Sequence, residues 1–182
     1  LSLGESEVDL LHVYESLEAD QFDLRLYRER TDYEAGFAAV TWSPDGSLLV
    51  AGSSEGQMLA WNPTDYTLVQ DNEEHSAGIT GFDWNTDGSQ LASVSWDQHL
   101  IVWDIASFDP VVEAADHQDG LTAVAWSPDD RRIVTGGRDD TVRIWDAATG
   151  TQLAVLIDHS DDVLAVDWAL NSQQVISGGW DN

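Results

Sequence analysis

Residues 117–146 read HQDGLTAVAWSPDDRRIVTGGRDDTVRIWD. Four short runs in and just after this stretch are rich in the β-branched and aromatic side chains that favour strands. These runs are Leu121–Trp126, Ile133–Thr135, Val142–Asp146 and Gln152–Ile157. Ser127–Asp130 contains a proline that fixes φ and aspartates that can cap a turn, and Gly136–Asp140 is predicted to form a second tight turn. Short strands joined by short turns predict an antiparallel meander.

The same pattern recurs with a period of 42 residues, without insertion or deletion. The periodic positions are a Trp on the first strand, a Trp on the third strand, a His before the first strand and an Asp in the second turn. They are Trp42, Trp84, Trp126 and Trp168; Trp61, Trp103 and Trp145; His75, His117 and His159; and Asp97, Asp139 and Asp181. The period divides most of the chain into the units 33–74, 75–116, 117–158 and 159–182.

This repeat resembles the WD-repeat family of β-propellers. The dipeptide that names the family stands at Trp103-Asp104 and Trp145-Asp146, and Trp61-Asn62 replaces it in the first unit. Ser43–Gly46 matches the family's first turn, and the unit length falls within the family range of about 40–45 residues. The resemblance covers residues 33–182. It implies an all-β fold in which four-stranded antiparallel blades surround a central channel.

The resemblance also implies a hydrogen-bonded network in each blade, which joins the His to a Ser or Thr of the second strand, the Asp of the second turn and the Trp of the third strand. Carried over by position, the sets are His75, Ser93, Asp97 and Trp103; His117, Thr135, Asp139 and Trp145; and His159, Ser177 and Asp181. The first unit departs from this pattern, because Tyr33, Ala51 and Glu55 replace the His, the Ser or Thr and the Asp. We expect that blade to lack the network and to rely on packing.

A His, a Ser and an Asp in one blade also resemble a nucleophilic triad. Three copies on a fixed period favour a structural role, because a catalytic site is normally single, and no nucleophile elbow or phosphate loop accompanies them. His residues that are separated by whole blades are also too far apart to share a metal ion. We therefore expect no catalytic residue, no metal site and no cofactor.

Two of the nine Trp residues, Trp96 and Trp180, do not belong to the periodic sets. Both directly precede the Asp of the second turn, at a position that holds Ser54 in the first unit and Arg138 in the third. This turn lies on one rim of the propeller in the resembled family. Because the position varies and carries residue types that are common in binding hot spots, we predict a ligand or peptide surface there. The alternative is that each Trp packs against the neighbouring blade.

The chain has 34 acidic residues, 7 basic residues that are all Arg, no Cys and a formal net charge of −27. Such a polyanion excludes binding to nucleic-acid phosphates or to an anionic membrane surface, and a chain without Cys excludes disulfides and thiolate metal sites. No stretch approaches the length of a membrane-spanning helix. We favour adaptation to high salt as the reason for the acidity, and a basic partner is the alternative.

Residues 1–32 do not repeat cleanly. Leu10–Glu15 and Leu24–Arg28 are predicted strands, and we interpret the segment as the third and fourth strands of a preceding, degenerate blade. A free-standing linker is the alternative. The fourth unit holds only two predicted strands, so the two pairs could close a four-bladed ring. A partial ring is the favoured interpretation, because WD-type blades usually close at about seven. We therefore expect a chain that is part of a longer polypeptide.

The resemblance implies a rigid, non-enzymatic scaffold that binds a protein or a peptide through its rim. The expected partners are therefore a protein or peptide and the remaining blades of the same polypeptide, with self-assembly as a further possibility. Two other functions stay open: a sensory or regulatory domain of a larger signalling protein, and an enzyme whose site lies in the channel. A polar cluster that breaks the repeat would indicate the enzyme, and the sequence shows none.

Overall fold

The computed structural model describes residues 11–18, 21–30 and 36–181, with side chains from residue 36 onward. The chain divides into two compact units, Leu1–Phe37 and Ala38–Asn182. Each unit is described by itself.

The first unit contains an antiparallel hairpin made of β1 (Leu11–Glu18) and β2 (Gln21–Arg30). Both strands are longer than the predicted runs, because cross-strand pairing extends from Leu11 opposite Arg30 to Glu18 opposite Gln21. Leu10, at the start of the first predicted strand, and Tyr33, at the start of the first unit, lie outside the described residues. The hairpin is a two-stranded sheet of its own.

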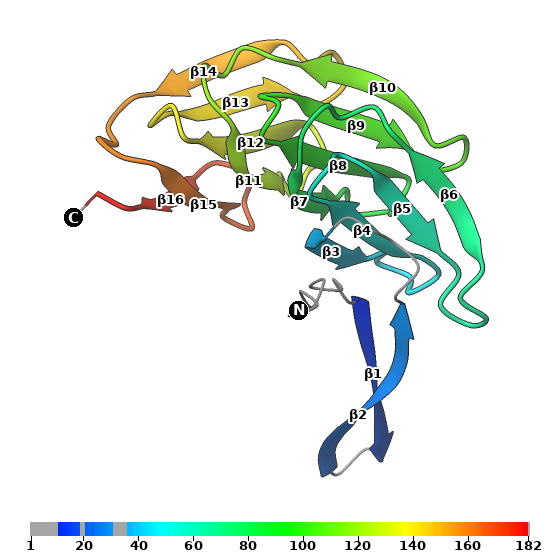
Figure 1. Cartoon of the computed structure of the whole chain (residues 1–182). Coiled ribbons are helices and arrows are strands. Elements are labelled where there is room, and N and C mark those ends of the chain that lie inside the picture. Colours follow the sequence, from blue (N-terminus) through cyan, green and yellow to red (C-terminus); the bar gives the residue numbers. More distant parts are fainter. Residues whose placement is uncertain (1–10, 19–20, 31–35, 182) are drawn as a thin grey trace, which may run out of the picture. The chain divides into compact units, whose positions relative to one another are not determined.

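The second unit consists of consecutive antiparallel sheets, which we call the first to fourth blades (Figure 1). The first blade contains β3 (Phe37–Trp42), β4 (Leu49–Ser53), β5 (Met58–Trp61) and β6 (Leu68–Asn72). The second contains β7 (Ile79–Trp84), β8 (Gln90–Ser95), β9 (Leu100–Asp104) and β10 (Asp109–Ala114). The third contains β11 (Leu121–Trp126), β12 (Arg132–Gly137), β13 (Val142–Asp146) and β14 (Gln152–Leu156), and the fourth contains β15 (Val163–Trp168) and β16 (Val175–Gly179).

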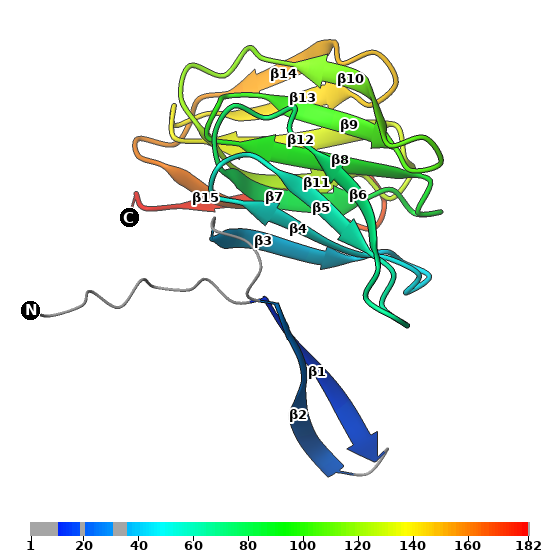
Figure 2. The ribbon, with the colours of Figure 1, turned by 45° about the vertical axis from the view of Figure 1, so that its right-hand side comes forward.

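The first strand of the second, third and fourth blades packs against the blade before it. Strand β11 contacts β7 on one side and β15 on the other, and β4 contacts β7. Figures 1 and 2 show β3, β7, β11 and β15 at the inner edge of the blades, while β6, β10 and β14 form the outer edge. The fold is the predicted all-β arrangement of propeller blades, and it forms a partial ring. In the described part of the chain, no helix is long and apolar enough to cross a membrane.

The hydrophobic core lies between the blades. One cluster joins Val50 and Met58 of the first blade to Ile79 and Trp84 of the second. The side chains of β4 and β5 are buried along their whole length, whereas those of β6 are mostly exposed. This pattern follows from the topology, because the two middle strands have a neighbouring strand on each side, whereas β6 is an edge strand. The packed sheets thus hold the turns that connect their strands in fixed positions.

In the third blade, β11 and β13 coincide with the predicted runs, but the second strand is longer than predicted. Gly136 and Gly137 belong to β12 and not to the turn, because they pair with β13 and β11 respectively. Gly136 fits there because the third and fourth blades approach closely: a Cβ atom at this position would lie 2.7 Å from a methyl carbon of Val163. The outer strand ends at Leu156, one residue before the predicted boundary.

Candidate functional site

The second blade brings together the four side chains that the family resemblance placed in one network. His75 Nδ1 lies 2.9 Å from Asp97 Oδ2, and His75 Nε2 lies 2.7 Å from Ser93 Oγ. Trp103 Nε1 donates to Ser93 Oγ at 2.9 Å. Because an ionised carboxylate only accepts hydrogen bonds, His75 donates from Nδ1, and its Nε2 accepts the proton of the Ser93 hydroxyl. Every polar group of the four side chains in this chain of contacts is thereby paired.

The carboxylate of Asp97 also fixes the backbone of the rim. It accepts the backbone N–H of Ser76 at 2.8 Å and that of His99 at 3.0 Å. Burial alone would raise the pKa of Asp97, but the hydrogen bond from His75, together with these N–H groups, lowers the pKa well below its usual value. The network therefore ties the loop before β7 to the turn between β8 and β9.

The third blade contains the equivalent network. His117 lies 2.9 Å from Asp139 and 2.8 Å from Thr135, whose hydroxyl oxygen also accepts Trp145 Nε1–H at 2.8 Å. Burial lowers the pKa of His117, and Asp139 acts in the opposite direction through its hydrogen bond and charge. The guanidinium of Arg143 lies 3.5 Å from Asp139 and adds a cation that the second blade does not have at this position.

The fourth and first blades differ from the second and third at the positions of this network. In the fourth blade, His159 lies 2.8 Å from Asp181 and 2.8 Å from Ser177, and its side chain is more exposed than that of His117. In the first blade, Ala51 has no hydroxyl group and the side chain of Glu55 is exposed. Ser53 Oγ instead accepts the backbone N–H groups of Glu55 and Gln57, so the turn is closed locally.

The hydroxyl groups of Ser93 and Thr135 are unsuited to nucleophilic attack. Ser93 and Thr135 have no exposed surface, and each hydroxyl oxygen already contacts a His and a Trp nitrogen. A substrate could not reach them without opening the blade. Their geometry is that of a buried polar network, which stabilises a fold when all its members are paired.

The four rim residues Ser54, Trp96, Arg138 and Trp180 occupy equivalent positions, and all are exposed. The backbone N–H groups of Trp96, Arg138 and Trp180 donate to the carbonyl oxygens of Gly78, Gly120 and Asp162 at 2.9–3.0 Å. Each turn is therefore attached to the loop that precedes the first strand of its own blade. The indole of Trp96 is 55% exposed and that of Trp180 is 64% exposed, so both present apolar surface to solvent.

Trp96 also contacts the next blade. The guanidinium carbon of Arg138 lies 5.1 Å from the centre of the Trp96 ring, within the range of a cation–π interaction. Arg138 Nε in turn lies 3.1 Å from Asp162 Oδ2 of the fourth blade. These three side chains, which we call the rim chain, thus link three consecutive blades. Trp96 packs on a neighbouring blade, as the alternative interpretation expected, and more than half of it stays exposed.

A pocket of about 380 Å³ lies at the rim between the first and second blades, with a mostly apolar lining. It is lined by Ala38, Ser54, Ala77, Gly78 and Trp96. The repeat pattern of the sequence does not predict this pocket. The available signal was the small size of Ser54 at a position where the other units carry Trp or Arg.

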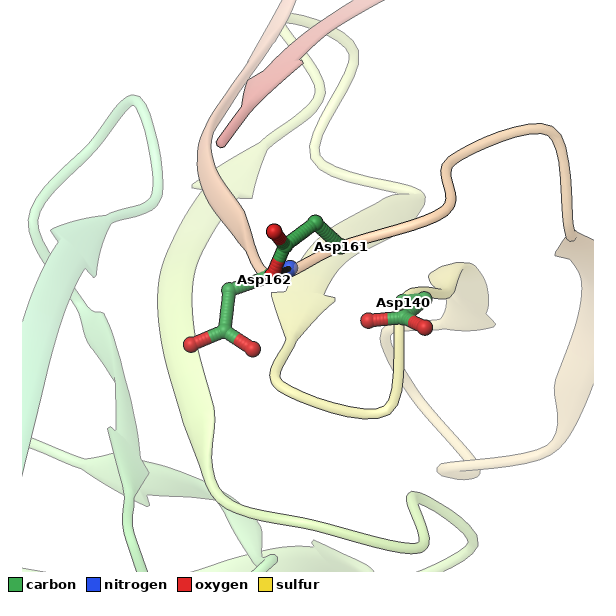
Figure 3. Close-up of side chains that lie close together, drawn as sticks. All are labelled: Asp140, Asp161 and Asp162. Carbon is green, nitrogen blue, oxygen red and sulfur yellow. Dashed lines mark hydrogen bonds between the residues drawn. The ribbon is translucent and has the colours of Figure 1, made fainter. Parts of the chain in front are cut away.

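The rim also holds an acidic cluster. Carboxylate oxygens of Asp140, Asp161 and Asp162 lie within 4.8 Å of one another (Figure 3). Asp140 belongs to the turn that follows β12, and the other two residues belong to the loop that precedes β15. Because Asp162 is also paired with Arg138, part of this charge is already compensated. Exposed carboxylates that gather in this way do not by themselves define a metal site.

Comparison with known proteins places the chain among repeat proteins. The family model described as "WD domain, G-beta repeat" matches residues 30–62, 66–104, 109–146 and 150–182. A similar solved structure is one chain of "Crystal Structure of Mitotic Checkpoint Complex", with 26% sequence identity and a TM-score of 0.81. That match covers 93% of this chain and 54% of the solved chain, so this chain spans little more than half of its length. No curated protein matches the sequence.

The matched ranges are offset from the blades. The range 66–104 begins just before β6, the outer strand of the first blade, and ends with β9, the third strand of the second. The range 109–146 likewise extends from β10 to β13. These two ranges, and likewise 150–182 with β14 to β16, are therefore each shared by two neighbouring blades.

Proposed function

The chain belongs to the WD-repeat family, and on that premise we propose that it is a non-enzymatic scaffold that binds a protein or a peptide through its rim. The observation that carries this proposal is the position of Trp96. Its indole is 55% exposed, forms one wall of a pocket and is attached to a turn whose backbone is hydrogen-bonded. Trp and Arg are enriched in the hot spots of protein interfaces, and the rim presents both.

The rigidity of the rim supports a binding function. Asp97 and Asp139 each join the turn of their blade to the loop before the first strand, and the rim chain joins the blades to one another. A surface that is ordered before binding loses little conformational entropy when the partner arrives. The variable side chains can therefore determine the partner while the periodic ones hold the frame.

The relative in the solved complex supports a protein partner. That chain, which is 26% identical over 93% of the present one, is part of a mitotic checkpoint complex. We carry over only the class of partner.

The hairpin of β1 and β2 has the antiparallel pairing of the third and fourth strands of a blade, and we propose that it is the outer half of a preceding blade.

The experiment is affinity capture from a lysate of the source cell, with the wild-type chain and a Trp96→Ala, Trp180→Ala double variant as baits. We expect the double variant to lose the specifically captured protein. Both baits are first compared by thermal unfolding, because loss of folding would also abolish capture. A folded double variant that captures the same proteins would contradict the rim as the binding surface. So would a double variant that does not fold, since the two side chains would then serve the fold.

A further inference from the structure

The junction between the first and second blades differs from the next two junctions in two positions. At the second and third junctions, a Thr on the first strand of one blade reaches the next blade. Thr80 Oγ1 donates to the carbonyl oxygen of Leu121 at 2.8 Å, and Thr122 Oγ1 donates to that of Val163. At the first junction the equivalent residue is Ala38, which has no hydroxyl group. The first junction therefore has a methyl group where the other two junctions have a hydrogen bond between blades.

The second difference concerns the rim residue of the earlier blade. At the second junction this residue is Trp96, and the next blade supplies Arg138, whose guanidinium lies over the indole ring. At the first junction the earlier residue is Ser54, and the next blade supplies Trp96. The small side chains of Ser54 and Ala38 leave space next to the indole, and the pocket of about 380 Å³ occupies that space.

The walls of this pocket are held in place. Gly78 lies so close to the first blade that a Cβ atom on it would be 2.9 Å from the carbonyl oxygen of Ser54. Gly56, with a φ of +100°, brings the turn of the first blade against the second, since a Cβ atom on it would be 2.3 Å from the carbonyl oxygen of His75. Both approaches require glycine, and the one at Gly78 holds a residue of the pocket wall against the first blade.

We propose that this pocket binds the side chain of an arginine from a basic segment of the partner, with the guanidinium against the indole of Trp96. This inference rests on the proposed function and names the chemistry of its partner. The pairing of Arg138 with Trp96 shows that the rim already forms this contact within the chain. The methylene groups of the arginine would lie along Ala38 and Ala77, which are apolar pocket walls.

Charge complementarity favours a cationic occupant. The chain carries a formal charge of −27, and Glu55 directly follows Ser54 in the turn. Arg138, whose guanidinium lies over the Trp96 ring, is paired with Asp162 at 3.1 Å, so its repulsion of a second cation is compensated. A planar guanidinium stacks on an aromatic face, whereas a lysine ammonium is compact and strongly hydrated, so arginine fits better than lysine.

The test is an NMR titration of the chain with the probe peptide Gly-Ser-Gly-Arg-Gly-Arg-Gly-Ser-Gly at about 0.15 M salt, where exposed charges are partly screened. The reporter is the indole N–H signal of Trp96, which is assigned from its absence in Trp96→Phe. Two further probes replace both arginines by lysine or by citrulline, which is planar but neutral. Ser54→Trp and Ser54→Arg fill the pocket with the residue types of the other units. Ala106→Trp, in the exposed turn after β9, is the control for added bulk.

The expected result is a shift of the Trp96 signal with the arginine probe and at least 10-fold weaker binding to both Ser54 variants, but unchanged binding to Ala106→Trp. The lysine and citrulline probes should bind more weakly. No shift of the Trp96 signal, equal binding of the three probes, or unchanged binding to a folded Ser54 variant would overturn the inference. If the double variant Trp96→Ala, Trp180→Ala still loses its captured protein in that case, the proposed function stands and only the arginine pocket is wrong.

Discussion

Arg138 and Trp96 stand at equivalent positions of neighbouring blades and are in contact with each other, with the guanidinium carbon 5.1 Å from the ring centre. The period of the sequence places both residues on the same rim, 42 positions apart. The contact means that one blade orients the exposed aromatic side chain of another. The rim therefore acts as a connected surface and not as a set of independent turns.

Replacement of Arg138 by alanine should expose the indole of Trp96 further. The cation–π contact is worth about 0.5–1 kcal/mol at an exposed site, so we expect a small loss of stability of this size. Iodide quenching of Trp fluorescence should increase. Arg131→Ala, an exposed arginine in the turn between β11 and β12, is the matched control and should leave quenching unchanged. Equal quenching in the two variants would show that Arg138 does not cover Trp96.

Replacement of Asp139 by alanine should destabilise the third blade, because the buried Nδ1–H of His117 loses its acceptor. An unsatisfied buried donor costs about 1–3 kcal/mol, measured as the free energy of unfolding in urea. Asp116→Ala removes an exposed carboxylate next to His117 and is the control. Asp181→Ala should have a smaller effect than Asp139→Ala, since the side chains of His159 and Asp181 are 19% and 21% exposed. The reverse order of the two effects would contradict the assignment of burial as the cause.

Acid should destabilise the fold in two steps. Burial lowers the pKa of His117 in the folded state below its usual value of 6.5, so its contribution is complete above pH 6.5 and is lost as the pH falls. Asp97 and Asp139 have a lowered pKa relative to the usual 3.8, and their contribution is lost below that pH. Asp83 has the opposite effect on stability as the pH falls, because burial raises its pKa and the folded state therefore favours its protonated form.

The measurement is the free energy of unfolding in urea at pH 7, 5.5 and 3.5, for the wild type and for His117→Gln. The wild type should lose stability at each step. The loss between pH 7 and 5.5 should be smaller in the variant, which lacks the titrating imidazole. An equal loss in both chains over that interval would show that another group is responsible.

Salt should stabilise the chain if its acidity is an adaptation to a saline solvent. The formal charge of −27 gives a self-repulsion that added ions screen, since the Debye length shortens from about 10 Å at 0.1 M to about 3 Å at 1 M salt. We expect the urea midpoint to rise between these two concentrations of KCl. Equal midpoints would exclude this explanation and would favour a basic partner.

The architecture could be predicted from the sequence because the pattern of strands and turns recurs with a period of 42 residues. The strands β11 and β13 coincide with their predicted runs, and His75, Ser93 and Asp97 lie in contact as the family pattern implied. Local composition determines these features, since turn residues and apolar runs alternate within one unit. The error at Gly136 has a tertiary cause: its pairing and the approach of Val163 keep it in the strand.

The pocket could not be predicted in this way, because it depends on two departures from the repeat that meet only in space. Ala38 lies on β3 and Ser54 lies in the turn after β4 of the same blade, whereas Trp96 belongs to the next blade. The pairing of Arg138 with both Trp96 and Asp162 also depends on side-chain conformation, which a periodic pattern does not specify. The one signal in the sequence was the difference between Ala38 and Ser54 and the residues at the equivalent positions of the other units.

The central claim, that the rim around Trp96 is a binding surface, is tested most directly by the affinity of the captured partner for the wild type and for Trp96→Ala. Isothermal titration calorimetry gives both dissociation constants, on samples with matching unfolding midpoints. Removal of a hot-spot side chain costs at least about 2 kcal/mol, so the account predicts a dissociation constant more than about 10-fold higher for the variant. Equal dissociation constants for the two folded chains would contradict it.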